Sequence, residues 1–191
     1  MRKISWVRYL AIPLLLIIMG CSENHIPRPT GYLRFNFPKH EYEPVKIGNV
    51  ATFDKPIYMI MTNKTSPMGE YWFDLQYPHY KTTIHFSYKT VNKNLAALSD
   101  DAHYFVYKHT VKASGIDEIP IINHETKNYG IIYRIKGDVA SNIQFIVTDS
   151  TNHFLRGSLY ILSKPNADSL APIIEFTQRD VEHMLNSIRW E

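Results

Sequence analysis

The only cysteine of the chain, Cys21, directly follows a short apolar segment and limits how the rest can be stabilised. The segment covers residues 9–19, comes after three basic residues and ends at Gly20. A basic start, an apolar stretch of about 7–15 residues and a small residue before the cleavage point form a secretory signal peptide. A cysteine directly after it is typical of a bacterial lipoprotein. Acylation of Cys21 removes the last free thiol, so packing rather than disulfides must stabilise the mature protein.

Two alternatives compete with this interpretation. A membrane-spanning helix needs roughly 20 apolar residues, whereas residues 9–19 are much shorter and contain Pro13. Secretion without acylation would leave an unpaired cysteine at the mature N-terminus. We therefore expect residues 1–20 to be a lipoprotein signal peptide. We expect Cys21 to carry the acyl chains, palmitate among them, that bind the protein to a membrane.

Removal of the signal peptide changes the charge of the protein. The whole chain carries 21 Lys and Arg against 18 Asp and Glu, with a formal net charge of +3. Arg2, Lys3 and Arg8 leave with the signal, which contains no acidic residue, so the mature chain has equal numbers of both signs. A nucleic-acid-binding protein needs a basic surface that neutralises phosphates. We therefore expect no nucleic-acid partner.

The mature chain divides into a tether and one domain. Pro27 and Pro29 favour an extended backbone in residues 21–30. At roughly 3.3 Å per residue, this tether reaches about 30 Å when fully extended. Residues 31–191 have a length that suits one globular domain, and the high content of aromatic residues, 13%, supports a packed core.

Strand patterns dominate this domain. Alternation of apolar and polar residues, or a run of strand-forming residues ended by proline or a turn, predicts strands at several places. The predicted strands are residues 32–37, 71–77, 81–90, 127–136, 143–148 and 153–162, with a short buried run at residues 56–61. The strands after residue 127 are joined by short polar connections, which favour an antiparallel meander.

Two segments have the period of an amphipathic helix. In residues 94–113 apolar residues recur at three- and four-residue steps, and Ser114-Gly115 follow as a stop. The recurring residues are Leu95, Leu98, Ala102, Phe105 and His109. The second helix follows residues 165–169 and has Pro172 in its first turn. Its apolar stripe is Leu170, Ile173, Ile174, Val181, Met184, Leu185 and Ile188. We expect a single α+β domain in which the two main helices pack on one face of an antiparallel β-sheet.

The sequence contains none of the common catalytic or metal-binding motifs. The nine histidines form no His-Glu-x-x-His element, no serine stands in a Gly-x-Ser-x-Gly elbow, and no glycine-rich loop opens a helix. Asp149, Ser150 and His153 have the residue types of a hydrolase triad, but they lie in one short loop whose composition is that of a turn. We expect a protein that is not an enzyme and that binds neither a metal nor a small-molecule cofactor.

Two arginines in the predicted strands are candidates for binding. Arg134 and Arg156 lie opposite the main apolar residues of their strands. A solvated outer sheet face is the simpler interpretation. The functional alternative is a polar groove that binds a peptide, a glycan or a partner protein, with Gln144 and Tyr160 beside the arginines. An envelope enzyme with a dispersed site on the sheet also stays open, because catalytic residues can converge from distant positions.

Several blocks spread over the mature chain carry a family resemblance. They are residues 27–32, 107–110, 129–133, 135–141, 154–160 and 165–172. These blocks resemble the gliding-motility lipoprotein GldD family. The resemblance implies a cell-envelope lipoprotein of a bacterium of the Bacteroidota. It also implies a part in gliding motility and the associated type 9 protein secretion, as a non-enzymatic docking or assembly factor. The family brings no established active-site residues.

Residues after the cysteine bear on the location. Ser22 favours transfer to the outer membrane over retention in the inner membrane, by analogy with other bacteria. Lipoproteins exported to the cell surface in this group tend to carry several acidic residues there, whereas Glu23 stands alone. We therefore expect a lipid-anchored protein of the outer membrane that faces the periplasm, with other gliding or secretion proteins as partners.

Overall fold

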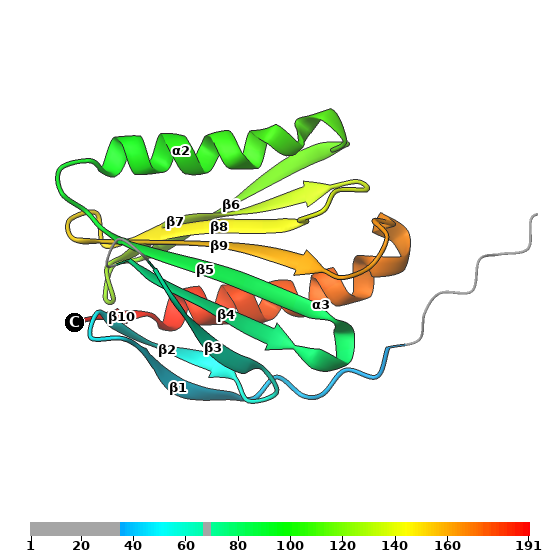
Figure 1. The fold of residues 1–191 in the computed structure, drawn as a ribbon, viewed down its shortest axis with the longest axis horizontal. Coiled ribbons are helices and arrows are strands. Elements are labelled where there is room, and N and C mark those ends of the chain that lie inside the picture. Colours follow the sequence, from blue (N-terminus) through cyan, green and yellow to red (C-terminus); the bar gives the residue numbers. More distant parts are fainter. Residues whose placement is uncertain (1–34, 67–69) are drawn as a thin grey trace, which may run out of the picture. The chain divides into compact units, whose positions relative to one another are not determined.

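The computed structural model of the protein describes residues 35–66 and 70–191. The predicted signal peptide, Cys21 and the tether lie outside the described residues. Within the described part, two α-helices accompany ten strands in two antiparallel sheets (Figure 1). The α+β class and the antiparallel pairing are therefore confirmed, but the strands form two sheets rather than one.

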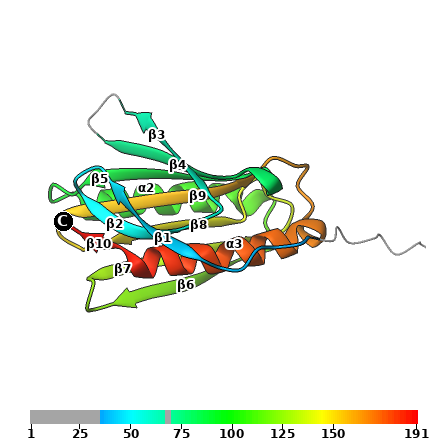
Figure 2. The ribbon, with the colours of Figure 1, turned by 90° about the horizontal axis from the view of Figure 1, so that it is seen from below.

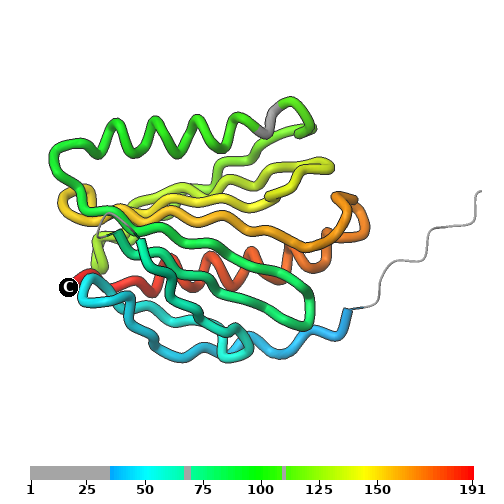
Figure 3. The backbone as a smooth tube through the Cα atoms, viewed as in Figure 1, coloured from blue at the N-terminus to red at the C-terminus, as the bar shows by residue number. Residues whose placement is uncertain are grey.

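The larger sheet has seven strands. In spatial order they are β3 (Ile60–Thr65), β4 (Tyr71–Tyr77), β5 (Thr82–Thr90), β9 (His153–Ile161), β8 (Ile143–Thr148), β7 (Asn128–Lys136) and β6 (Gly115–Asn123). The smaller sheet contains β1 (Tyr42–Ile47), β2 (Ala51–Pro56) and β10 (Arg189–Trp190). The final strand β10 pairs with β2, so segments from the two ends of the domain lie side by side (Figure 3).

The two helices, α2 (Leu95–Tyr107) and α3 (Ala167–Ser187), lie on opposite faces of the larger sheet. Successive side chains of a strand point to opposite faces. In β7, Ile132 packs in the buried cluster that includes α3, whereas Tyr133 packs in the cluster that includes α2. Figure 2 shows α3 in front of the strands and α2 behind them. The prediction that both helices pack on one face is wrong, because β7 and β8 bury apolar residues on both of their faces.

The buried stripe of α3 agrees with the sequence. All of its predicted apolar residues are buried, and Phe176 joins them. Asn166 caps the helix, because its side chain accepts a hydrogen bond from the backbone N–H of Ser169 at 3.1 Å. The helix begins at Ala167, so Pro172 lies in its second turn and not in the first as predicted.

The helix α2 is shorter than predicted. It ends at Tyr107 and continues as the 3₁₀ turn η2 (Lys108–Val111). Leu98, Ala102 and Val106 form its buried face, whereas Phe105, which was predicted to face the core, is half exposed. The apolar pattern overestimated the length of the helix, because large apolar residues near its end face outwards.

The start of the domain packs through aromatic rings. Residues 35–37 of the predicted strand 32–37 are not strand, and residues 32–34 lie outside the described residues. Phe37 instead stacks on Phe176 of α3 with ring centroids 4.3 Å apart, and Phe35 stacks on Phe37. A further 3₁₀ turn, η1 (Pro78–Tyr80), brings the Tyr80 ring against both phenylalanines.

A buried carboxylate joins this first segment to α3. Asp180 is fully buried, and its oxygens accept hydrogen bonds from the hydroxyls of Tyr58 at 2.7 Å and Tyr42 at 3.0 Å. The ring Nδ1 of His40 lies 2.8 Å from Oδ1. Burial raises the pKa of the Asp180 carboxyl, and the hydrogen bonds from Tyr58 and His40 oppose that rise. Burial and the nearby carboxylate raise the pKa of Tyr58 as well, which keeps its hydroxyl a donor.

The loop between β8 and β9 is a turn organised by Asp149. Its Oδ1 accepts hydrogen bonds from the backbone N–H groups of Thr151, Asn152 and His153 at 2.8–3.0 Å, and its Oδ2 accepts one from the Thr151 hydroxyl. The His153 ring does not face Asp149: it contacts the Tyr88 hydroxyl at 2.9 Å. The arrangement supports the interpretation of this loop as a turn.

The charge of Asp149 should make stability depend on pH. Burial alone would raise its pKa, but the hydrogen bonds from the Thr151 hydroxyl and the backbone outweigh burial and lower the pKa to about 2. The folded pKa lies below the unfolded one, so the stabilisation is complete above about pH 4 and is lost as the pH falls towards 2. We expect Asp149→Asn to lower the free energy of unfolding by about 2 kcal/mol at neutral pH.

Urea unfolding between neutral and acidic pH measures this effect. The difference between the wild type and Asp149→Asn should shrink towards zero as the pH falls to about 2. Asp100→Asn, at an exposed position of α2, is the matched control and should behave as the wild type. A difference that stays constant over the pH range would contradict the assigned role.

Candidate functional site

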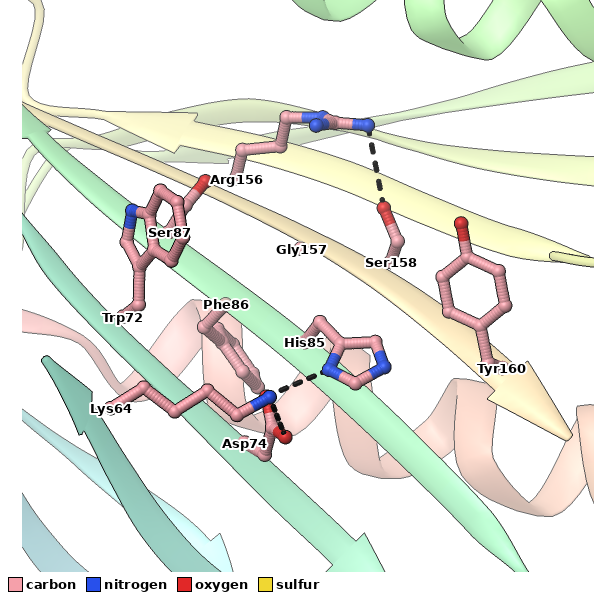
Figure 4. Close-up of a pocket in the computed structure, with 10 residues that line it drawn as sticks. All are labelled: Lys64, Trp72, Asp74, His85, Phe86, Ser87, Arg156, Gly157, Ser158 and Tyr160. Carbon is pink, nitrogen blue, oxygen red and sulfur yellow. Dashed lines mark hydrogen bonds and ion pairs between the residues drawn. The ribbon is translucent and has the colours of Figure 1, made fainter. Parts of the chain in front are cut away.

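The helix α2 covers only part of one face of the larger sheet. The helix α2 packs over Tyr133, Ile135, Ile146 and Phe154 on β7, β8 and the start of β9. On β3, β4, β5 and the rest of β9, the same face is polar and hollowed (Figure 4). We call this hollow of about 390 Å³ the sheet groove. Its lining residues are Lys64, Trp72, Asp74, His85, Phe86, Ser87, Arg156, Gly157, Ser158 and Tyr160.

The strand register places the polar side chains of the sheet groove in rows. Asp74 of β4 pairs with His85 of β5, which pairs with Ser158 of β9, which pairs with Gln144 of β8. Paired residues of neighbouring strands point to the same face. The alternate residues of these strands enter the core below, so the sequence pattern that builds the core also gathers the polar row.

The row begins with a neutralised carboxylate. Asp74 is buried and lies 2.5 Å from the Lys64 ammonium and 2.7 Å from Nδ1 of His85. An Asp–His pair beside a serine has the residue types of a hydrolytic site. Among the described residues, however, no hydrogen bond joins His85 to Ser158, whose hydroxyl oxygen instead lies 3.5 Å from Arg156. The geometry is that of an ion-pair network and not of an activated nucleophile.

Arg156 holds a charge that no carboxylate offsets. Its guanidinium lies 4.6 Å from the centre of the Phe105 ring and donates a hydrogen bond to Oε1 of Gln144 at 3.2 Å. Within residues 35–66 and 70–191 it forms no ion pair within 4.0 Å. Burial lowers the pKa of Arg156, but a guanidinium stays protonated in proteins. The side chain is therefore a half-buried cation with neutral partners.

Exposed aromatic rings flank the sheet groove. Trp72 and Tyr160 are each 41% exposed, and Figure 4 shows them on either side of Arg156 and His85. The Trp72 indole N–H donates to Glu70 at 3.0 Å, which fixes its orientation. A second hollow of about 200 Å³ shares Trp72 and Arg156 with the sheet groove and extends it towards Phe105 of α2.

Gly157 in β9 allows this strand to pack closely against the core beneath the sheet groove. A Cβ at Gly157 would lie 2.1 Å from the Phe145 ring. The ring therefore occupies the space that any larger side chain would need, and β9 can lie close to the core only with glycine at this position.

Three of the four predicted binding residues meet in or beside the sheet groove. Arg156 and Tyr160 line it, and Gln144 lies beneath Arg156 as its hydrogen-bond acceptor. Arg134 is on the opposite face, with its guanidinium 3.5 Å from Glu175 of α3. As predicted from the sequence, Arg134 lies opposite the main apolar residues of β7. Those apolar residues face α2, so Arg134 faces α3. In β9 the buried leucines, Leu155 and Leu159, belong to the cluster that includes α3. The same rule therefore selects opposite faces of the sheet in the two strands.

Sequence reasoning did not select Trp72, Asp74 or Lys64. The alternation in residues 81–90 did place His85 and Ser87 on a polar face, and this was the available signal for that part of the groove. The partners on β3 and β4 depend on the strand pairing. Among the described residues, no cluster of His, Asp and Glu has the arrangement of a metal site.

The groove and its supporting strands lie within the part of the chain that matches a known family. The family model described as gliding motility lipoprotein GldD matches residues 22–190. The chain belongs to this family. The resemblance seen in the sequence is thereby confirmed. Membership in the GldD family identifies a membrane-anchored lipoprotein of the cell envelope with a part in gliding motility.

Two further findings accompany the GldD assignment. No curated protein matches the chain. In the described part of the chain, neither helix combines the length and the hydropathy of a membrane span. The GldD family is not a known enzyme family.

Proposed function

We propose that the protein is a non-enzymatic docking component of the gliding machinery and of the associated type 9 secretion. In this proposal it is held by its lipid on the periplasmic side of the outer membrane. Family membership supports the gliding role, and Ser22 with the single acidic residue Glu23 supports the location. The docking role depends on a surface of α2.

This surface, which we call the α2 ridge, consists of Tyr104 and Phe105 of α2 and of Val111 of the η2 turn that follows. Tyr104 is 61% and Val111 is 92% exposed, and Phe105 is half exposed. The ammonium of Lys108 lies 4.4 Å from the centre of the Tyr104 ring. Grouped exposed apolar side chains mark interaction sites, and tyrosine is among the residues enriched at interface centres. The exposed ridge is the observation that carries the docking proposal.

Replacing Tyr104 by alanine should weaken docking without unfolding the protein. A central interface residue contributes about 2 kcal/mol, so we expect affinity to fall about 30-fold. Crosslinking and affinity purification from native membranes, with quantification of the recovered gliding and secretion proteins, measures the loss. Cells that carry the variant should glide poorly.

Ile122→Ala is the matched control, because Ile122 is an equally exposed apolar residue on β6. It should leave recovery of partners and gliding at the wild-type level. Equal recovery with Tyr104→Ala and Ile122→Ala would reject the ridge as the contact surface. Recovery of the wild type only as a free monomer in gentle detergent would reject the docking role itself.

A further inference from the structure

Among the described residues around the sheet groove, one cation has no counter-charge. Lys64 faces Asp74, and Lys89 faces Glu70 at 3.2 Å. Within the described part of the chain, the partners of Arg156 are Phe105, Gln144 and Ser158, none of which carries a charge. Asp101 of α2 and Arg156 both line the adjoining hollow, but these two side chains form no ion pair. A half-buried guanidinium whose N–H groups are not all used can bind a planar anion. A carboxylate fits best, because its two oxygens match the paired N–H groups of the guanidinium.

The walls of the groove are suited to a sugar ring. The exposed rings of Trp72 and Tyr160 offer flat apolar surfaces with a polar edge. Between them, the side chains of His85, Ser87 and Ser158 offer hydrogen-bonding groups of the kind that pair with hydroxyls. The hollow of about 390 Å³ falls within the range of about 300–1,000 Å³ that is usual for small-ligand sites.

The floor of the groove disfavours a peptide. Its strands β4, β5 and β9 lie inside the sheet and have a hydrogen-bonded strand on each side. Their backbone groups are used in the ladder, so the backbone of a bound peptide would find no N–H or C=O partners there. Peptides that bind sheets usually add to a free edge. Side-chain recognition of a compact, hydroxyl-rich ligand is the better fit.

We propose that the sheet groove binds an acidic saccharide, with the sugar carboxylate on Arg156 and a sugar ring stacked on Trp72 or Tyr160. Gln144 and Ser158 orient the guanidinium, and the Lys64–Asp74–His85 cluster forms the polar wall beside it. The α2 ridge touches this site at one point, because its residue Phe105 also contacts Arg156. The docking test changes Tyr104 and the saccharide test changes Arg156, so each variant leaves the other proposal's test residue in place.

Calorimetric titration of the full lipidated protein in mild detergent tests the proposal. The probe is a tetrasaccharide of alternating glucuronic acid and N-acetylglucosamine. The matched probe is the same tetrasaccharide after reduction of its carboxylates to alcohols. Hydrogen bonds to a charged group should make the acidic probe bind about 10- to 100-fold more tightly than the reduced one. Trp72 gives a second readout, because a stacked sugar should change its fluorescence.

Variants separate the charge of Arg156 from its structural contacts. Arg156→Gln should weaken the acidic probe about 10- to 100-fold and leave the reduced probe unchanged. Arg156→Lys should have an intermediate effect, since it keeps the charge without the fork. Arg134→Gln, on the other face of the sheet, is the matched control and should bind as the wild type. Thermal unfolding of each variant shows that it is folded.

Three results would overturn the proposal. Equal affinity for the acidic and the reduced probe would show that the sugar carboxylate does not contribute to binding. Absence of saturable binding by either probe to the folded wild type would reject a saccharide as the ligand of the sheet groove. Tighter binding of tetraglutamate than of the acidic tetrasaccharide, with loss in Arg156→Gln, would assign the groove to acidic peptides instead.

Discussion

Asp180→Ala is expected to lower the free energy of unfolding by about 3 kcal/mol, because it removes three hydrogen bonds that contribute about 1 kcal/mol each. A domain of this size has a total stability of about 5–15 kcal/mol, so the loss is large. The carboxylate is fully buried and is the shared acceptor of His40, Tyr42 and Tyr58. Its removal leaves the Tyr58 hydroxyl without its acceptor and detaches the first segment of the domain from α3.

Urea unfolding followed by circular dichroism measures this loss. Arg179→Ala is the matched control, because Arg179 is the exposed neighbour on the same helix turn, and it should change stability by no more than about 0.5 kcal/mol. Asp180→Asn keeps the shape and one acceptor oxygen, so it should fall between the two. Equal stability of Asp180→Ala and Arg179→Ala would show that the cluster does not hold the segment in place.

On the proposed outer-membrane location, Cys21→Ala is expected to remove nearly all of the protein from that membrane. Without the thiol no acyl chain can be attached, and several chains at one cysteine are needed for firm anchoring because a single chain is marginal. The domain itself should fold, because Cys21 precedes the residues that form its core. The variant should be found in the inner membrane with an uncleaved signal, or in the soluble fraction.

Gradient separation of the membranes, with intact-mass measurement of the purified protein, tests this expectation. Asn24→Ala is the control, because it changes a nearby residue of the tether and keeps the thiol. Protease treatment of intact cells should leave the wild type uncut if it faces the periplasm. Wild-type behaviour of Cys21→Ala in the gradient would reject the lipid anchor, and cleavage of the wild type in intact cells would place it on the surface.

The sequence predicts best those elements that have one buried and one solvent-exposed face. Residues 81–90 alternate in this way and appear as β5, and the stripe of α3 is buried as expected. The pattern was less informative for β8, which is buried on both faces and therefore hides the presence of a helix on each side. The strands β1 and β6 each bury only one residue and show no clear alternation, so they were not predicted.

The candidate site follows the same rule. A charge in the middle of a strand is conspicuous, and Arg156 was selected for that reason together with Gln144 and Tyr160. Whether Arg134 belonged with them depended on which face of each strand carries which helix, and local patterning does not contain that information. Trp72 and Asp74 join the groove only through the pairing of β4 with β5. Such neighbours are defined by the register between strands.

The pairing of β10 with β2 has a consequence for the order of events during export. The smaller sheet takes its first two strands from the beginning of the domain and its third from residues 189–190. The acceptor for His40 and Tyr42 also comes late, from α3. A chain that crosses the membrane from its N-terminus therefore cannot complete this layer until the last strand has emerged. Contacts of such long sequence separation form slowly, so we expect the smaller sheet to be the last part of the domain to form.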